Sequence, residues 1–163
     1  MPRLGGVNHI TFITRDMDRL VMFYEEVFEA HKLMELPVPP LNGRHALIDV
    51  GGGTVLHPFE IPGSNQPGPG QPMFGRGRLD HFALQAPDAE TFESLRERLV
   101  DRGVSDGVIT DFGVMKVLTF TDPDGLEVEV AHWVGGSDPA KIDMARATDE
   151  ELFPRRAETA AKV

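Results

Sequence analysis

The chain has 163 residues and no cysteine, and its 26 Asp and Glu outnumber its 16 Lys and Arg, giving a formal net charge of −10. Without cysteine, disulfides, thiolate nucleophiles and thiolate metal ligands are excluded, and the acidic balance argues against nucleic-acid binding, which needs clustered Lys and Arg. Apolar runs fall far short of the ~20 residues that span a bilayer, and no apolar signal segment opens the sequence, so we expect a cytoplasmic protein without membrane association.

The first predicted elements are a strand at residues 7–13 and an amphipathic helix, for which Asp16 is a plausible N-cap. Strands are predicted next at 45–50 and 54–61, with a further one near 33–38, and the triple glycine at 51–53 is a turn signal. The apolar residues of the helix recur at the spacing of one helical face: Met17, Leu20, Val21, Tyr24, Val27 and Phe28.

The same order of elements follows in the second half of the chain. A strand is predicted at 79–86 and a helix after the N-cap Asp88, with apolar positions at Phe92, Leu95 and Leu99 and a C-terminal stop at Gly103. Strands are then predicted near 107–111, at 114–121 and at 126–133, the last two separated by a DPDG turn.

An internal repeat explains this similarity. VNHITFITRDMDRLVMFYEEVF, which begins at Val7, aligns with LDHFALQAPDAETFESLRERLV, which begins 72 positions later at Leu79. Each copy predicts a βαβββ module, at about residues 5–61 and 79–134. We therefore expect an α+β fold, with two tandem modules that form one cupped mixed β-sheet with flanking helices in a single domain of residues 1–136.

Two segments lie outside the modules. Residues 62–78 hold four Pro and five Gly and predict a linker or a loop at the rim of an active site, where Arg76 and Arg78 either meet an anionic substrate or are solvated charges. Residues 137–163 predict a C-terminal helical extension, because Asp138-Pro139 is typical of a helix start and Thr148 with Glu151 forms a capping-box pattern. A frayed tail is the alternative.

The repeat also places four metal-capable side chains at two equivalent positions. His9 corresponds to His81, and His57 corresponds to Glu129, with the same separation in both copies. If the first and last strands of each module pair, the two members of each pair approach each other on one face, and a pseudo-twofold then joins the pairs. Three imidazoles and one carboxylate suit a borderline divalent metal. The sequence therefore predicts a metal site formed by His9, His57, His81 and Glu129.

Other polar residues are weaker candidates. Glu60 and His132 are also equivalent in the repeat, at the strand ends, but alternation places Glu60 on the face opposite His57. Glu127 corresponds to an apolar residue and is left out of the site. We expect surface roles for His31 and His45, which have no polar counterpart.

The motifs NHITF, RDMDRLVMFYEEVF, DHFAL and DPDGLEVEV resemble those of the vicinal oxygen chelate superfamily, which includes glyoxalase I, methylmalonyl-CoA epimerase, fosfomycin-resistance enzymes, extradiol dioxygenases and bleomycin-resistance proteins. The resemblance covers about residues 5–134 and matches His9, His81 and Glu129 to ligand positions. His57 departs from it, because this position is Glu in glyoxalase I and Gln in the epimerase. The resemblance implies a homodimer and a small substrate with adjacent oxygens, chelated at Zn, Ni, Co, Mn or Fe(II).

Three functions are compatible with this pattern. We favour a metal-dependent isomerase or lyase, in which the metal polarises a substrate oxygen and Glu129 or another carboxylate near the substrate transfers a proton. The histidine at position 57 argues against a standard glyoxalase I. The alternatives are an Fe(II)-dependent extradiol-type dioxygenase that uses His9, His81 and Glu129, and a ligand-binding protein of the bleomycin-resistance kind. We expect Tyr24 to pack in the core, and Pro58 to interrupt strand pairing just beyond His57.

Overall fold

The computed structural model describes residues 6–64, 79, 81–136, 141 and 143. The chain divides into two compact units, the first made of residues 1–80 and 122–126 and the second of residues 81–121 and 127–163. Arg76, Arg78 and the predicted caps of the C-terminal extension lie outside the described residues. No helix in the described ranges is long and apolar enough to cross a membrane.

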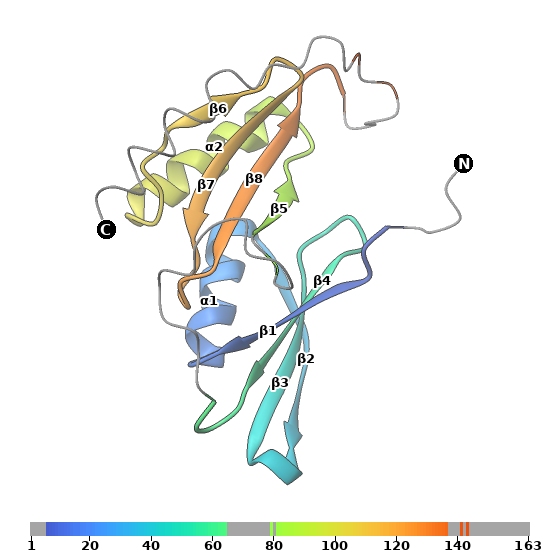
Figure 1. Cartoon of the computed structure of the whole chain (residues 1–163), viewed down its shortest axis with the longest axis vertical. Coiled ribbons are helices and arrows are strands. Elements are labelled where there is room, and N and C mark those ends of the chain that lie inside the picture. Colours follow the sequence, from blue (N-terminus) through green and yellow to red (C-terminus); the bar gives the residue numbers. More distant parts are fainter. Residues whose placement is uncertain (1–5, 65–78, 80, 137–140, 142, 144–163) are drawn as a thin grey trace. The chain divides into compact units, whose positions relative to one another are not determined.

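The first unit contains one βαβββ module (Figure 1). Its sheet has the order β1-β4-β3-β2, in which β1 pairs in parallel with β4 and the other neighbours are antiparallel. The parallel pair places the first and last strands side by side, which meets the condition on which the predicted approach of His9 and His57 depends. The elements are β1 (His9–Thr14), α1 (Met17–Phe28), β2 (His31–Val38), a short 3-10 helix η1 (Pro39–Leu41), β3 (Gly43–Asp49) and β4 (Val55–Glu60).

The second unit repeats this topology. Its sheet has the order β5-β8-β7-β6, and again the first strand pairs in parallel with the last. The predicted duplication of a βαβββ module in an α+β fold is therefore confirmed, whereas one cupped sheet shared by both modules stays a prediction. The elements are β5 (Phe82–Gln85), α2 (Ala89–Asp101), β6 (Ile109–Asp111), β7 (Met115–Thr121) and β8 (Glu127–Trp133).

Both helices begin at the predicted N-caps. Asp16 Oδ1 accepts a hydrogen bond from the backbone N–H of Arg19 at 3.0 Å, and Asp88 Oδ1 accepts one from that of Thr91 at 2.7 Å. Each carboxylate thereby satisfies a backbone donor that the first turn of a helix leaves without a partner. Helix α2 ends just before Gly103, whose φ of +68° is the left-handed conformation that glycine adopts at low cost.

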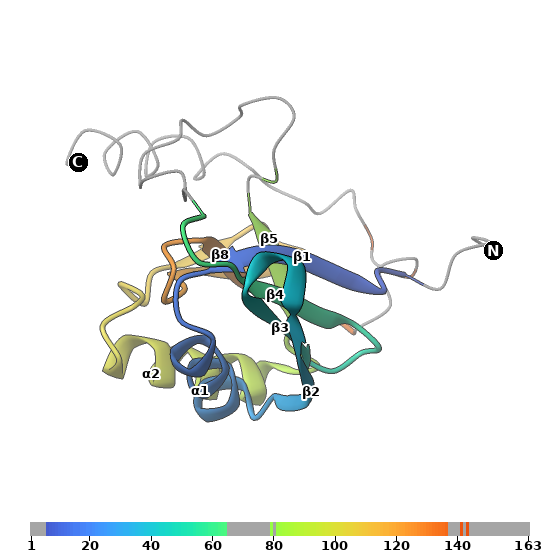
Figure 2. The same cartoon turned by 90° about the horizontal axis from the view of Figure 1, so that it is seen from below.

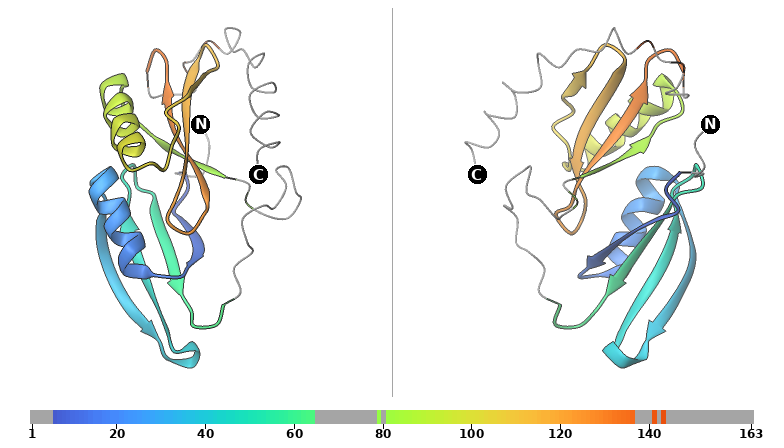
Figure 3. Two further views of the ribbon diagram at one scale, coloured as in Figure 1. Left: turned by 90° about the vertical axis from the view of Figure 1, so that its left-hand side faces the viewer. Right: turned by 45° about the vertical axis from the view of Figure 1, so that its right-hand side comes forward.

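In each module the helix covers one face of the sheet (Figures 2 and 3). Helix α1 packs on β2, β3 and β4, and α2 packs on β8. Two contacts identify the helix side of the strands: Glu60 of β4 accepts a hydrogen bond from the backbone N–H of Met17, and the ring centroid of His132 of β8 lies 6.2 Å from that of Phe92 of α2. Because side chains alternate along a strand, His57 and Glu129 lie on the opposite face of their sheets.

The face of α1 that the sequence predicts is the face that the structure buries. Five of its six predicted apolar residues are buried together with Phe23: Met17, Leu20, Val21, Tyr24 and Val27. Tyr24 is fully buried, as expected for a core residue. Burial of this stripe is the main source of stability for a helix of this length, since propensity alone leaves a 12-residue helix marginal.

Arg44 of β3 ties the start of α1 to three strands. Its guanidinium forms ion pairs with Asp18 of α1 at 3.1 Å, with Glu35 of β2 at 3.0 Å and with Glu60 of β4 at 2.9 Å. Glu60 Oε2 also accepts the Met17 backbone N–H at 2.6 Å. The network therefore holds α1 in place over the side of the sheet that is opposite His57.

The pairing of β3 and β4 is interrupted beside Pro58, as the sequence predicts. Residues pair from Arg44 with Glu60 to His45 with Phe59, and pairing then resumes only at Ile48 with Leu56. The proline has no backbone N–H to donate to a ladder. The gap falls at the level of His57 and Pro58, next to the predicted metal site.

Candidate metal centre

In the first module, β1 and β4 bring His9 and His57 together. The parallel register aligns His9 with Val55 and Thr11 with His57, so the two histidines are diagonal neighbours on one face of the sheet. Their ring centroids are 5.5 Å apart. His57 is half-buried, and burial, followed by the neighbouring His45 and His9, lowers the pKa of its imidazole. The lowered pKa favours the neutral ring, which is the form of histidine that binds a metal.

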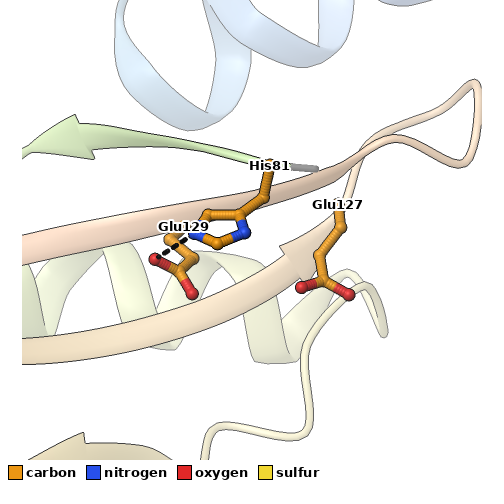
Figure 4. Close-up of side chains that lie close together, drawn as sticks. All are labelled: His81, Glu127 and Glu129. Atoms are coloured by element: carbon orange, nitrogen blue, oxygen red, sulfur yellow. Dashed lines mark ion pairs between the residues drawn. The ribbon is translucent and has the colours of Figure 1, made fainter. Parts of the chain in front are cut away.

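In the second module, β5 and β8 bring His81 and Glu129 together (Figure 4). Ala83 of β5 pairs with Glu129 of β8, and His81 lies just before β5. Nε2 of His81 is 3.5 Å from Oε2 of Glu129. The Glu129 residue is only 7% exposed, which is uncommon for a carboxylate unless it is paired or binds a metal.

A third carboxylate belongs to the same cluster. One ligand atom each of His81, Glu127 and Glu129 lies within 4.8 Å of the others, and in Figure 4 the three side chains extend to the same side of the strands. Glu127 is exposed, whereas Glu129 is buried. Glu127 is not among the ligands predicted from the sequence, because it has no polar counterpart in the repeat. The signal that identifies it is strand alternation, since residues 127 and 129 share a face.

The donor set of the second module fits a divalent metal. Zn²⁺ binds imidazole nitrogen and carboxylate oxygen at about 2.0–2.2 Å, so two such ligands at a tetrahedral angle lie about 3.4 Å apart. The distance of 3.5 Å between His81 Nε2 and Glu129 Oε2 matches this separation. Nitrogen and oxygen donors in this combination also suit the other borderline divalent ions.

The expectation of a surface role for His45 is wrong. Its Nδ1 lies 2.8 Å from Nε2 of His57, and the residue is half-buried. Its ring also stacks on Phe59, with centroids 5.1 Å apart and planes at 13°. The partner of His45 lies on the neighbouring strand, where a comparison of repeat positions does not find it. His31, by contrast, is exposed as expected.

Glu60 and His132, the other pair of polar residues at equivalent repeat positions, lie on the helix side of their sheets. Glu60 bonds the first turn of α1 and Arg44, which leaves it a structural role. His132 contacts Phe92, and its Nδ1 is buried without a hydrogen-bond partner in the described structure. Both side chains thus lie on the opposite sheet faces from His57 and Glu129.

The structure therefore forms two pairs, one in each unit: His9 with His57, and His81 with Glu129. That all four ligands meet at one ion stays a prediction.

Comparison with known families gives a match over most of the chain. A family model described as the Glyoxalase/Bleomycin resistance protein/Dioxygenase superfamily matches residues 6–130. This range contains the strands and helix of the first module, most of the second module and all four predicted ligands.

Solved structures share the fold. A glyoxylase/bleomycin resistance protein/dioxygenase domain from Frankia sp. EAN1pec has a TM-score of 0.67 at 24% identity, covering 82% of this chain and 96% of its own. The trypanothione-dependent glyoxalase I of Leishmania major has a TM-score of 0.59 at 21% identity, covering 78% and 86%. A mutant of the genomically encoded fosfomycin resistance protein FosX of Listeria monocytogenes, complexed with Mn(II) and 1S,2S-dihydroxypropylphosphonic acid, has a TM-score of 0.55 at 20% identity, covering 79% and 93%.

Proposed function

The chain belongs to the glyoxalase/bleomycin resistance protein/dioxygenase superfamily, and from this premise we propose that it is a metal-dependent, glyoxalase-like enzyme of the isomerase or lyase type. Its substrate is a small molecule whose adjacent oxygens bind a divalent metal. The observation that carries this proposal is the 3.5 Å approach of His81 Nε2 to the buried carboxylate of Glu129. The equivalent approach of His9 to His57 in the first module supports it.

We assign the four predicted residues as ligands: His9, His57, His81 and Glu129. A bound divalent ion, whether Zn, Ni, Co, Mn or Fe(II), acts as a Lewis acid toward a substrate oxygen. A carboxylate beside that oxygen is in place to move a proton at the neighbouring carbon. Glu129 is the first candidate for this role, and Glu127 is the second, because its exposed carboxylate belongs to the same cluster.

His57 occupies the position that is a glutamate in glyoxalase I, and this difference limits the proton-transfer reactions that the site can catalyse. A ligand set with one glutamate from each module would provide a carboxylate on both sides of the metal. Here the ligand Glu129 and the neighbouring carboxylate of Glu127 both come from the second module. Proton transfer is therefore expected from one side of the substrate only. This favours an isomerase or lyase other than a standard glyoxalase I.

Metal analysis of the full chain tests the site. Purified wild type is compared with His9→Ala, His57→Ala and His81→Ala, and with His31→Ala as a control that removes an exposed histidine of β2. If one four-ligand centre exists, the first three variants lose metal and the control keeps it. Wild type that binds no divalent metal contradicts the proposal, and loss confined to His81→Ala restricts the site to the second module.

Proton exchange tests the reaction. The loaded enzyme is incubated in deuterated water with α-keto hemithioacetals or with acyl-CoA esters, and deuterium at the carbon next to the carbonyl is measured. Incorporation that requires both the metal and Glu129 supports the proposal. Absence of exchange with every metal contradicts the isomerase or lyase assignment.

One observation favours a second function. Because His57 Nε2 contacts His45, His57 could serve the fold alone and leave His9, His81 and Glu129 as a two-histidine, one-carboxylate set. Such a set is typical of Fe(II) oxygenases. Oxygen uptake with catechols in the presence of Fe(II) distinguishes this function, together with retention of iron by His57→Ala.

We propose that residues 1–136 form one domain with residues 137–163 as a helical extension, and that the protein is a cytoplasmic homodimer. Sedimentation analysis of the full chain tests the dimer, because a monomer at micromolar concentration contradicts it.

A further inference from the structure

We infer that His45 is a positioning residue that fixes the ring tautomer of His57, so that Nδ1 of His57 is the atom presented to a metal. The inference rests on the proposed metal site. Its basis is the contact of 2.8 Å between Nδ1 of His45 and Nε2 of His57. The partner of His57 is thus an imidazole on the neighbouring strand.

The local structure holds both rings in place. In the antiparallel register of β3 and β4, His45 is opposite Phe59, and His57 lies two residues from Phe59 on the same face. The Phe59 ring stacks on His45 and its centroid is 4.6 Å from that of His57. The regular pairing of the strands is interrupted at the level of His57. Phe59 therefore packs on both rings and restricts their rotation.

Two neutral imidazoles that meet nitrogen to nitrogen share one proton, and its position decides what His57 can do. If His57 donates from Nε2, His45 accepts at Nδ1, and the Nδ1 of His57 carries a lone pair. If His45 donates instead, His57 accepts at Nε2, and its own proton then lies on Nδ1. Only the first arrangement leaves His57 a nitrogen with which to bind a metal.

His9 has an equivalent outer partner. Its Nδ1 lies 2.8 Å from the side-chain oxygen Oδ1 of Asn8, which only accepts hydrogen bonds. We assign the proton of the neutral His9 ring to Nδ1 on the basis of this contact, which leaves the lone pair on Nε2. Metal-binding histidines commonly donate their second N–H to such an acceptor, which fixes the tautomer and the ring orientation. In the first module, Asn8 serves His9 in this way and His45 serves His57.

The two variants of His45 separate its hydrogen bond from its packing. His45→Phe keeps a ring that stacks on Phe59 but removes the acceptor. His45→Asn restores an acceptor oxygen near the position of Nδ1. His31→Phe is the control, because it makes the same substitution at an exposed histidine of the same sheet. Circular dichroism confirms that each full-length variant is folded before it is measured.

The tautomer is read by ¹⁵N–¹H correlation spectra of histidine-labelled protein at pH 8, with and without Zn²⁺. In wild type we expect His57 to carry its proton on Nε2, and Zn²⁺ to shift the Nδ1 resonance. We expect His45→Phe to lose the single tautomer and to weaken Zn²⁺ binding about 10–100-fold, the usual loss for such partners. His45→Asn should recover the single tautomer and a Zn²⁺ affinity within a few-fold of wild type. His31→Phe should match wild type in both measurements.

The inference fails if His57 of wild type carries its proton on Nδ1, or if His45→Phe keeps the wild-type tautomer and Zn²⁺ affinity. The metal-free spectrum makes this failure distinct from failure of the proposed function. A wild-type protein that binds no Zn²⁺ overturns the proposed function and the role of Nδ1 as a ligand. The tautomer of His57 in His45→Phe still decides whether His45 fixes it.

Discussion

Nε2 of His81 lies 3.5 Å from Oε2 of Glu129, and the glutamate is buried while Glu127, two residues earlier on the same strand, is exposed. We therefore expect substitution of the two carboxylates to reduce metal affinity by different amounts. Glu129→Gln removes a charged ligand of a buried site, so we expect divalent metal affinity to fall by more than about 100-fold, beyond the loss seen for outer partners. Glu127→Gln removes a carboxylate that water can replace, so we expect a loss of about 10-fold or less.

Isothermal titration with Zn²⁺ measures both effects in the full chain. Glu97→Gln is the matched control, because it makes the same change at an exposed position of α2. Equal losses for Glu127→Gln and Glu129→Gln would mean that both carboxylates are direct ligands. No loss for Glu129→Gln would contradict its role in the site.

The local elements of this fold follow from short-range chemistry, which is why the sequence predicts them. The carboxylates of Asp16 and Asp88 cap the helices within three residues of chain. Alternation along β4 places Leu56 and Pro58 in the buried layer and His57 on the other face. Each of these features depends on residues that are close in sequence.

The contacts that sequence patterns miss are those between strands. The pair His45 and His57 depends on the register of β3 and β4, and that register is interrupted beside Pro58. A comparison of repeat positions also favours residues with an equivalent partner, so it passes over Glu127, whose counterpart is apolar. Convergence of the two modules depends on how they pack, and residue spacing within each module does not determine it.

The Arg44 network predicts a stability effect. Arg44→Met leaves the partly buried carboxylates of Glu35 and Glu60 without their shared cation, and we expect the free energy of unfolding to fall by about 1–2 kcal/mol, between the values for exposed and buried pairs. Lys32→Met is the control, because it removes one ion pair between an exposed lysine and Glu35 and should cost about 0.5 kcal/mol or less. Urea unfolding measures both.

The same network predicts the direction of acid sensitivity. Hydrogen bonds from Lys32 and then Arg44 lower the pKa of Glu35, so its stabilising contribution is full above the ordinary pKa of the carboxyl and is lost as the pH falls through the lowered value. We expect Arg44→Met to lose less stability than wild type between pH 5 and pH 3. An unchanged acid slope would show that Arg44 contributes little to the ionisation of its partners.

Asp122 should give the free energy of unfolding a pH dependence of the opposite sign. This residue is 4% exposed, and its Oδ1 accepts the backbone N–H groups of Asp124 at 2.9 Å and Leu126 at 2.8 Å. Burial raises the pKa of its carboxyl to about 6. The folded protein then keeps a proton that the unfolded chain has released, so this group lowers the free energy of unfolding as the pH rises from about 4 to about 6.

Asp122→Asn tests this slope because the amide keeps the acceptor oxygen and cannot ionise. We expect the variant to be at least as stable as wild type at pH 7 and to lack the decline between pH 4 and pH 6 that Asp122 contributes. Urea unfolding at four pH values measures it, with Asp101→Asn at an exposed position of α2 as the control. Parallel pH profiles for wild type and Asp122→Asn would contradict the raised pKa.

His132 lies on the helix side of β8, opposite the face that carries Glu129, and we expect its replacement to affect stability and not metal binding. It alternates with Glu129 along the strand, its ring lies beside Phe92 of α2, and its Nδ1 is buried without a hydrogen-bond partner in the described structure. Replacing a buried polar group that has no partner with an apolar one removes a desolvation cost. We therefore expect His132→Phe to leave the free energy of unfolding unchanged or to raise it by up to about 1 kcal/mol.

The same variant tests whether the alternative pair of Glu60 and His132, and not the predicted ligands, binds the metal. His132→Phe should bind Zn²⁺ with the affinity of wild type, whereas His81→Phe, the same substitution on the opposite face of the sheet, should lose it. Titration calorimetry and urea unfolding on both variants provide the two readouts. If His132→Phe lost metal while remaining folded, the ligands would have to be sought on the helix side of β8, and Glu129 would no longer mark the metal-binding face.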